Sequence, residues 1–93
     1  MTDVETDIGG DGPSAATAAT VLEFLVRQLV DDPDGVSVDA VDRSRGVQLE
    51  VRVAAGDMGR VIGKRGRTAQ AIRTVTRAAA VKDGTEVNIE FME

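Results

Sequence analysis

The residues that could do chemistry in this 93-residue sequence are concentrated in one segment, RVIGKRGRTAQAIR, at positions 60–73. Two glycines, Gly63 and Gly66, enclose Lys64 and Arg65. Glycine adopts backbone conformations that are closed to other residues, and without a Cβ it lets another backbone approach closely. Cations at the tip of such a turn, beside the free N–H groups that begin a helix, attract anions. The segment therefore predicts a loop that holds a phosphodiester backbone, although glycines that only cap two helices would give the same pattern.

The spacing of the same residues does not support a catalytic function. The P-loop of nucleotide hydrolases has the form G-x-x-x-x-G-K followed by Ser or Thr, whose hydroxyl holds Mg²⁺. Here Gly59 and Gly63 are one residue too close, and Arg65 follows the lysine. The sequence contains no histidine and no cysteine, so its serines have no histidine to activate them. We therefore predict no catalytic residue, no cofactor site and no metal site.

The distribution of charge favours an anionic partner despite a formal net charge of −5. Residues 60–82 contain seven bases and no acid, whereas residues 1–50 contain 11 acids and three bases. The local field matters more than the total charge when a protein binds an anion. A basic helix face that is only solvated is the alternative interpretation of this run.

The chain is expected to form one domain, residues 14–93, after a disordered acidic tail at residues 1–13. The first ten residues, MTDVETDIGG, are acidic, whereas a signal peptide is basic and then apolar. No apolar run approaches the roughly 20 residues that span a bilayer. We therefore expect a cytoplasmic protein without a membrane partner.

Periodicity and turn signals predict the element order α-β-β-α-α-β. The expected helices and strands lie at residues 14–31 (helix), 36–42 (strand), 47–53 (strand), 57–62 (helix), 67–81 (helix) and 86–92 (strand). Ser14 and Asp57 are the expected N-caps of the first two helices. The first two strands should pair antiparallel, and the path to the third is long enough for a right-handed parallel crossover. The predicted fold class is α+β, with a three-stranded mixed sheet packed on three helices.

The apolar positions of these elements define an expected core. In the strands, these positions follow strict alternation at Val47, Leu49, Val51, Val53, Val87, Ile89 and Phe91. In the two longer helices, they are Ala18, Val21, Leu22, Leu25, Leu29, Val30, Ala69, Ile72, Val75, Thr76 and Ala79. Both phenylalanines, Phe24 and Phe91, are also expected in the core, which leaves no aromatic side chain for binding.

The string VIGKRGRTAQAIR, between a short helix and a long one and after an alternating strand, resembles the KH domain. The element order is similar to that of the prokaryotic, type II KH domain, and the resemblance extends over residues 20–92. The string is also similar to the core of the small bacterial single-KH-domain proteins of the KhpA type. KH domains bind single-stranded nucleic acid, and their G-x-x-G loop clamps about four nucleotides.

This resemblance implies an RNA-binding site centred on the loop. The implied clamp is Gly63, Lys64, Arg65 and Gly66. Of the apolar pair Val61 and Ile62, one should pack in the core while the other, assigned to Ile62, floors a groove for bases. The residues implied to reach phosphates beside the loop are Arg60, Arg67 and Thr68. Arg73 and Arg77 lie farther along the helix and are equally consistent with solvated surface.

The resemblance also implies a non-catalytic RNA chaperone or post-transcriptional regulator. Its implied partners are single-stranded RNA, a second copy of the chain in a homodimer, or a larger Jag-type KH-domain RNA-binding protein in a heterodimer. The resemblance further implies that the protein and this larger partner act in a pathway that affects cell shape and cell division. The expected dimer contact is a helix surface near the loop, with Met58, Val61 or Ile62. The absence of Trp and Tyr predicts low affinity and weak sequence preference. The alternative is that the KH fold serves mainly as a dimerisation or protein-interaction module.

Overall fold

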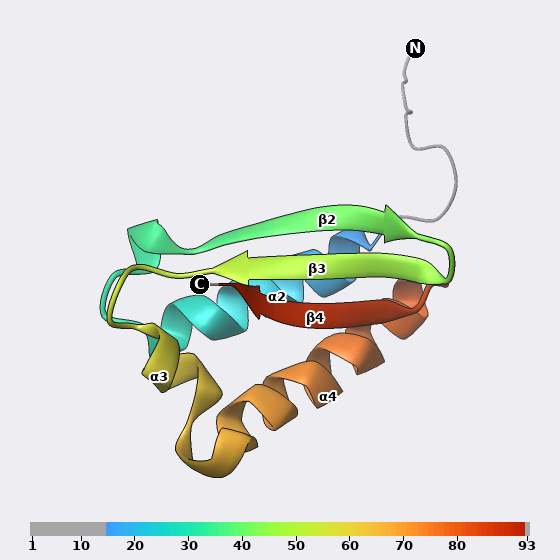
Figure 1. The fold of residues 1–93 in the computed structure, drawn as a ribbon. Helices are drawn as coiled ribbons and strands as arrows, with labels where there is room; N and C mark the ends of the chain where they lie inside the picture. Colours follow the sequence, from blue (N-terminus) through green and yellow to red (C-terminus); the bar gives the residue numbers. More distant parts are fainter. Residues whose placement is uncertain (1–14, 93) are drawn as a thin grey trace.

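A computed structural model describes residues 15–92, and within them the predicted order α-β-β-α-α-β is confirmed (Figure 1). The helices and strands are α2 (Ala16–Leu29), β2 (Ser37–Arg43), β3 (Gly46–Arg52), α3 (Met58–Ile62), α4 (Arg67–Asp83) and β4 (Val87–Met92). Two short 3₁₀ turns, η1 (Pro33–Gly35) and η2 (Lys64–Gly66), follow α2 and α3. The predicted tail at residues 1–13 and the predicted cap Ser14 lie outside the described residues.

The three strands form one mixed sheet in the order β2-β3-β4, as predicted. β2 and β3 pair antiparallel, with Ala40 opposite Leu49. β3 and β4 pair parallel, with Leu49 opposite Ile89. The chain between these parallel strands runs through α3 and α4, which supplies the length that a parallel connection needs.

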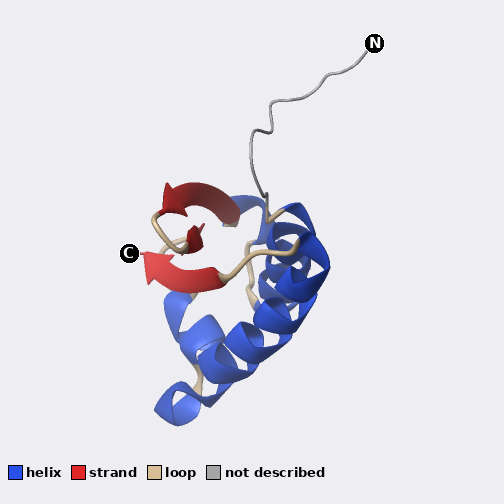
Figure 2. Cartoon of the chain, turned by 90° about the vertical axis from the view of Figure 1, so that its right-hand side faces the viewer, coloured by secondary structure: helices blue, strands red, loops and turns tan. Residues whose placement is uncertain are grey.

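The helices α2 and α4 lie against each other and cover one face of the sheet, while the other face is open (Figure 2). The core fills the space between these layers. Its largest fully buried side chains are Leu22, Val26, Leu49, Val51, Val61, Thr76 and Ile89. The strand positions follow the predicted alternation, because successive side chains of a strand point to opposite faces of the sheet. Each buried Leu, Ile or Val contributes roughly 1.5–3 kcal/mol relative to an exposed one.

In the helices, the buried residues differ in part from those predicted for the core. Phe24 is 62% exposed, Val75 is 48% exposed and Leu29 is 37% exposed, so none of the three lies in the core. The sheet-facing stripe of α2 consists of Ala18, Leu22 and Val26, which are spaced four residues apart. Because α2 is apolar on more than one side, the sequence pattern alone did not select this stripe. On α4, Ala80 is fully buried, rather than the expected Ala79.

The first turn of α2 is bound by a carboxylate from the far end of α4. Asp83 accepts hydrogen bonds from the backbone N–H groups of Thr17 (3.1 Å) and Ala18 (2.9 Å). These N–H groups have no partner within their own helix. Asp83 therefore caps the helix as an N-cap residue would, although it is 65 residues from Ala18 in the sequence. Burial alone would raise the pKa of Asp83, but the hydrogen bonds from Ala18 and Thr17 outweigh it and the pKa is lowered.

Candidate nucleic-acid interface

Gly63 ends α3 in a conformation that no other residue adopts easily. Its backbone dihedral angles are φ 75° and ψ 175°, and its N–H donates to the carbonyl of Gly59 at 3.0 Å. A Cβ at this position would lie 2.6 Å from the Cβ of Thr68 and 3.0 Å from its backbone nitrogen. Glycine is therefore needed at Gly63 both for its φ and because Thr68 occupies the adjoining space.

The turn η2 reverses the chain between α3 and α4. Arg65 has left-handed dihedral angles of φ 58° and ψ 25°, and Gly66 follows with φ 73°. The Gly66 N–H donates to the carbonyl of Gly63 at 3.2 Å, which closes the turn. A Cβ at Gly66 would contact no atom of the protein. The backbone of Gly66 is therefore open to approach from outside, in contrast to that of Gly63.

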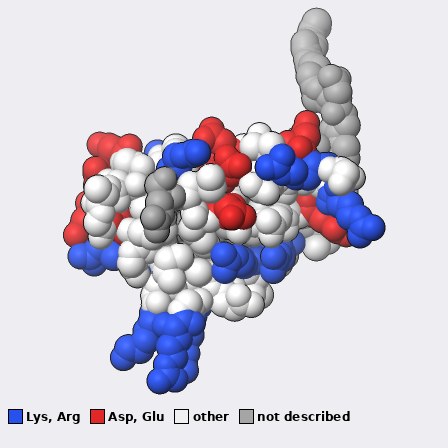
Figure 3. Space-filling view, in the orientation of Figure 1, with Lys and Arg blue, Asp and Glu red and all other residues white. Residues whose placement is uncertain are grey.

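The tip of this loop carries a cluster of basic side chains. Lys64, Arg65 and Arg67 are all exposed, and Figure 3 shows basic side chains projecting from the body where α3 meets α4. Within residues 15–92, the side chains of these three residues make no hydrogen bond or ion pair. Their charges are thus available to an external anion, and η2 brings together the predicted clamp residues of the loop.

Arg60, one turn before the loop, is held by acids. Its guanidinium lies 2.9 Å from Oδ2 of Asp31 and 3.5 Å from Oδ1 of Asp57. Asp57 stands at the N-cap position of α3, but its carboxylate makes no capping hydrogen bond. Instead it accepts from the N–H groups of Asp31 (3.2 Å) and Asp32 (3.1 Å), so the predicted capping role is wrong. The Asp57 carboxylate is buried. Two backbone N–H groups and one guanidinium bind it more strongly than a single capping hydrogen bond to α3 would.

The apolar residues before the loop divide into one buried and one accessible side chain. Val61 is fully buried in the core, while Ile62 packs against the core and remains partly exposed. Val61 therefore cannot take part in the predicted dimer contact. Ile62 remains the residue predicted to floor a groove.

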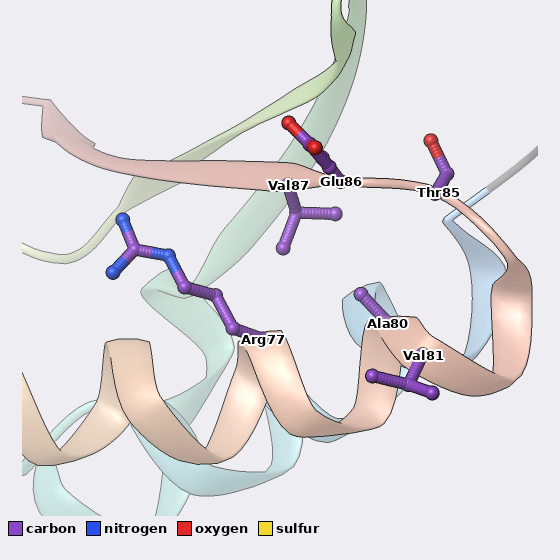
Figure 4. Close-up of a pocket in the computed structure, with 6 residues that line it drawn as sticks. All are labelled: Arg77, Ala80, Val81, Thr85, Glu86 and Val87. Carbon is purple, nitrogen blue, oxygen red and sulfur yellow. The ribbon is translucent and has the colours of Figure 1, made fainter.

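Beyond the loop, α4 packs against the edge strand β4. Nε of Arg73 donates to the carbonyl of Ile89 at 3.4 Å, and its guanidinium carbon lies 5.2 Å from the ring centre of Phe91. Farther along, a hollow of about 280 Å³ separates Arg77 from Val87 (Figure 4). In that view the Arg77 side chain extends from α4 toward β4, and Val87 points back toward the helix. No local sequence signal predicts the Arg73–Phe91 pair, because its members are 18 residues apart.

Other kinds of site find no support in the described part of the chain. Residues 15–92 contain no group of three or more His, Cys, Asp or Glu side chains that could hold a metal ion. None of the helices among these residues is long and apolar enough to cross a bilayer. The loop and the adjoining edge where α4 meets β4 are therefore the strongest candidate site.

Comparison with known families agrees with the observed fold. The family model described as "KhpA/KhpB, KH domain" matches residues 19–91. The chain belongs to this family. The family is non-enzymatic, which confirms that the chain is not an enzyme, and the predicted α+β, type II KH fold is also confirmed.

The curated relatives named RNA-binding protein KhpA include two from different bacteria. The protein from Clostridium acetobutylicum is 50% identical over 72 residues, covering 77% of this chain and 96% of the relative. The protein from Leifsonia xyli is 47% identical over 75 residues, covering 81% of this chain and 96% of the relative.

Solved structures of Era share the fold at low sequence identity. A GDP·AlF₄⁻-bound Era from Aquifex aeolicus matches with a TM-score of 0.63 at 19% identity, over 94% of this chain and 35% of Era. Era in complex with MgGDPNP and nucleotides 1506–1542 of 16S ribosomal RNA matches with a TM-score of 0.63 at 20% identity. That match covers 87% of this chain and 31% of Era, so the likeness is to about one third of the Era chain.

Proposed function

We propose that this protein binds single-stranded RNA without catalysis and that the loop Gly63-Lys64-Arg65-Gly66 clamps the phosphodiester backbone. The observation that carries the proposal is the projecting loop tip, where three exposed cations have no side-chain partner within residues 15–92. The name of the curated relatives, RNA-binding protein KhpA, supports the same partner.

The parts of the loop have different roles in this proposal. The open backbone of Gly66 lets a sugar-phosphate chain approach closely, while Lys64, Arg65 and Arg67 neutralise phosphates. Arg60 joins them when it exchanges its exposed partner Asp31 for a phosphate, which is a small loss because exposed ion pairs contribute little. Ile62 forms the apolar floor against which a base rests. The Thr68 side chain packs against Gly63 and so helps to hold the loop in place. Its hydroxyl is the group that would bind a phosphate.

We extend the proposal to the cellular role as a cytoplasmic RNA chaperone or post-transcriptional regulator. A short groove and few aromatic side chains limit the affinity to about micromolar and the sequence preference to a weak one. Weak, unselective contacts suit a protein that acts on many transcripts. A Jag-type KH-domain partner, in a pathway that affects cell shape and division, belongs to the same proposal.

The loop is tested by reversing its charge. The variant Lys64→Asp/Arg65→Asp should lose binding to a fluorescent single-stranded RNA, measured by anisotropy, because two carboxylates repel the phosphates. The matched control is Arg43→Asp/Arg45→Asp, which makes the same change in charge at the exposed β2–β3 turn. Binding by the control with no binding by the loop variant, at unchanged circular dichroism, supports the clamp. Equal binding by wild type and the loop variant would sink it.

Salt and strandedness provide a second test of the same proposal. If two to four phosphates are neutralised, the slope of log K against log salt should be roughly −1.5 to −3, at about −0.7 per phosphate. A duplex of the same sequence should bind much more weakly, because its bases are not free to enter the groove. Tighter binding to the duplex contradicts the proposal.

A second candidate function, dimerisation, is favoured by an apolar hollow on the outer side of α2 and α4. The hollow has a volume of about 240 Å³ and is lined by Leu25, Gln28, Leu29, Thr68, Ala71, Ile72 and Val75. No charged side chain is among these residues, so two copies can place the same patch face to face about a twofold axis. We therefore propose this surface for the homodimer contact, in place of the predicted Met58, Val61 or Ile62. It also touches the loop through Thr68, which would couple dimerisation to RNA binding.

Light scattering behind a sizing column, loaded well above micromolar, measures this contact. The wild type should elute with the mass of two chains, and Val75→Glu should elute with the mass of one. Val81→Glu is the matched control, because Val81 is an exposed α4 residue outside the hollow. A mass of one chain for the wild type contradicts the homodimer.

A further inference from the structure

Arg73 differs from the other cations of α4 in how firmly it is held. Its Nε donates to the carbonyl of Ile89, and its guanidinium lies over the ring of Phe91. Within residues 15–92, the side chains of Arg67 and Arg77 make no hydrogen bond or ion pair. A guanidinium that donates from its Nε and lies over an aromatic ring is a more restrained planar surface than a free arginine side chain.

This surface lies where α4 meets the edge strand β4. Arg73 is half-buried between α4 and β4, where Figure 3 shows basic side chains along the edge of the sheet. It comes seven residues after Gly66, which places it about 10 Å along the helix axis from the loop. An RNA strand that is held at the loop and runs along α4 would therefore pass Arg73.

The sequence offers few aromatic side chains on which a base could stack. The chain has no Trp and no Tyr, and its two phenylalanines are Phe24 and Phe91. Phe24 lies about 200° around α2 from the buried Leu22, on the side facing away from the sheet. Bases of single-stranded RNA stack on aromatic rings and on arginine guanidinium planes.

We propose that Arg73, held over Phe91, is the stacking surface for one nucleobase of a bound single-stranded RNA. This inference rests on the proposed function, and it assigns Arg73 to base contact rather than to phosphate contact. The two roles make different demands on the side chain. A phosphate contact requires only the positive charge, which lysine retains, whereas a stacking contact requires the planar guanidinium.

The test combines a protein variant with removal of single bases from the RNA. A five-nucleotide RNA of mixed sequence is compared with five versions, each lacking one base but keeping its sugar and phosphate. For wild type, one position should show a loss of affinity of at least about fivefold, the value of one stacked base. In Arg73→Lys that penalty should disappear, because intact and abasic RNA then bind equally, while the salt slope is unchanged.

Two further variants keep the result interpretable. Arg77→Lys, one turn farther along α4, should retain the abasic penalty in full. Phe91→Leu removes the ring beneath the guanidinium and leaves every charge in place, so it should reduce the same penalty even if Arg73→Lys disturbs the sheet edge. An Arg73→Lys profile identical to wild type overturns the inference, as does loss of the penalty in Arg77→Lys as well.

The failure of this inference is distinguishable from failure of the proposed function. If Lys64→Asp/Arg65→Asp binds RNA as tightly as wild type, the clamp itself is wrong. If that variant loses binding while Arg73→Lys keeps the wild-type abasic profile, only the stacking role is wrong. A salt slope that is about 0.7 smaller in magnitude in Arg73→Gln, with no change in any abasic penalty, makes Arg73 a phosphate contact and overturns the inference.

Discussion

The two ends of α4 are built from opposite kinds of contact. At its first end, Lys64, Arg65 and Arg67 are exposed, and their side chains have no partner within residues 15–92. At its last, C-terminal end, the Asp83 carboxylate accepts two hydrogen bonds from backbone N–H groups in the first turn of α2. The chain there leaves the helix through Gly84, whose N–H donates to the carbonyl of Val81 at 3.1 Å.

This difference separates stability from binding along a single helix. Polar groups that are satisfied inside the protein stabilise the fold and leave little for a ligand to bond. Exposed charges contribute little to stability, and they remain free to meet an anion. Substitutions at the last end should therefore change stability alone, while substitutions of the loop cations should change binding alone.

The largest effect on stability is expected at Gly63, which ends α3 and begins the binding loop. Gly63→Ala should lower stability by about 3 kcal/mol or more, because it adds a Cβ against Thr68 in a backbone region that only glycine occupies readily. The melting temperature should fall by more than about 12 °C, measured by circular dichroism.

Gly66→Ala is the matched control, because it has a positive φ but open space around its Cβ. It should lower stability by only about 1 kcal/mol, the cost of a left-handed residue. Equal losses in the two alanine variants would mean that Thr68 does not confine Gly63.

The loop and the sheet were predictable from sequence because their causes are local. Strand alternation placed Leu49 and Val51 in the core correctly, since a half-buried strand repeats every two residues. The glycines of the loop were identified from their spacing alone, and Gly63 and Gly66 both have positive φ. Element order followed from turn signals of a few residues each.

The contacts that sequence analysis missed join distant segments. Asp83 binds α2 from 65 residues away, and Asp57 binds the residues after α2 from 26 residues away. The exposed Phe24 and Val75 were assigned to the core because both long helices are apolar on more than one side. Which side faces the sheet depends on packing between the layers, and no window of sequence contains that information.

Asp83, at the C-terminal end of α4, should affect stability but not RNA binding. Asp83→Ala should lower stability by about 1–2 kcal/mol, as loss of an N-cap does, and should leave RNA binding unchanged. Thermal melting and anisotropy measured on the same sample check both parts. Weakened RNA binding by the folded variant would contradict the separation between the two ends.

The effect of Asp83 should also depend on pH. Because the pKa of Asp83 is lowered in the folded protein, its stabilisation is fully present above its usual pKa of about 3.9. It is lost as the pH falls through the lowered folded value. The difference in melting temperature between wild type and Asp83→Ala should therefore be constant near neutral pH and should narrow below about pH 4. A difference that widens on acidification would contradict this assignment.

The middle of α4 provides the smallest effect and the cleanest separation of stability from binding. Thr76 is fully buried, and its Oγ1 has no hydrogen-bond partner in the described structure. Thr76→Val keeps the shape of the side chain and removes the unsatisfied hydroxyl, so it should raise stability by about 1 kcal/mol. The melting temperature should rise by about 4–8 °C. Thr76→Ser, which keeps the hydroxyl and removes a methyl group, should instead lower it. RNA affinity should be unchanged in both variants, since neither touches the loop or the groove; a rise in melting temperature accompanied by lost affinity would show that the core of α4 and its binding surface are coupled.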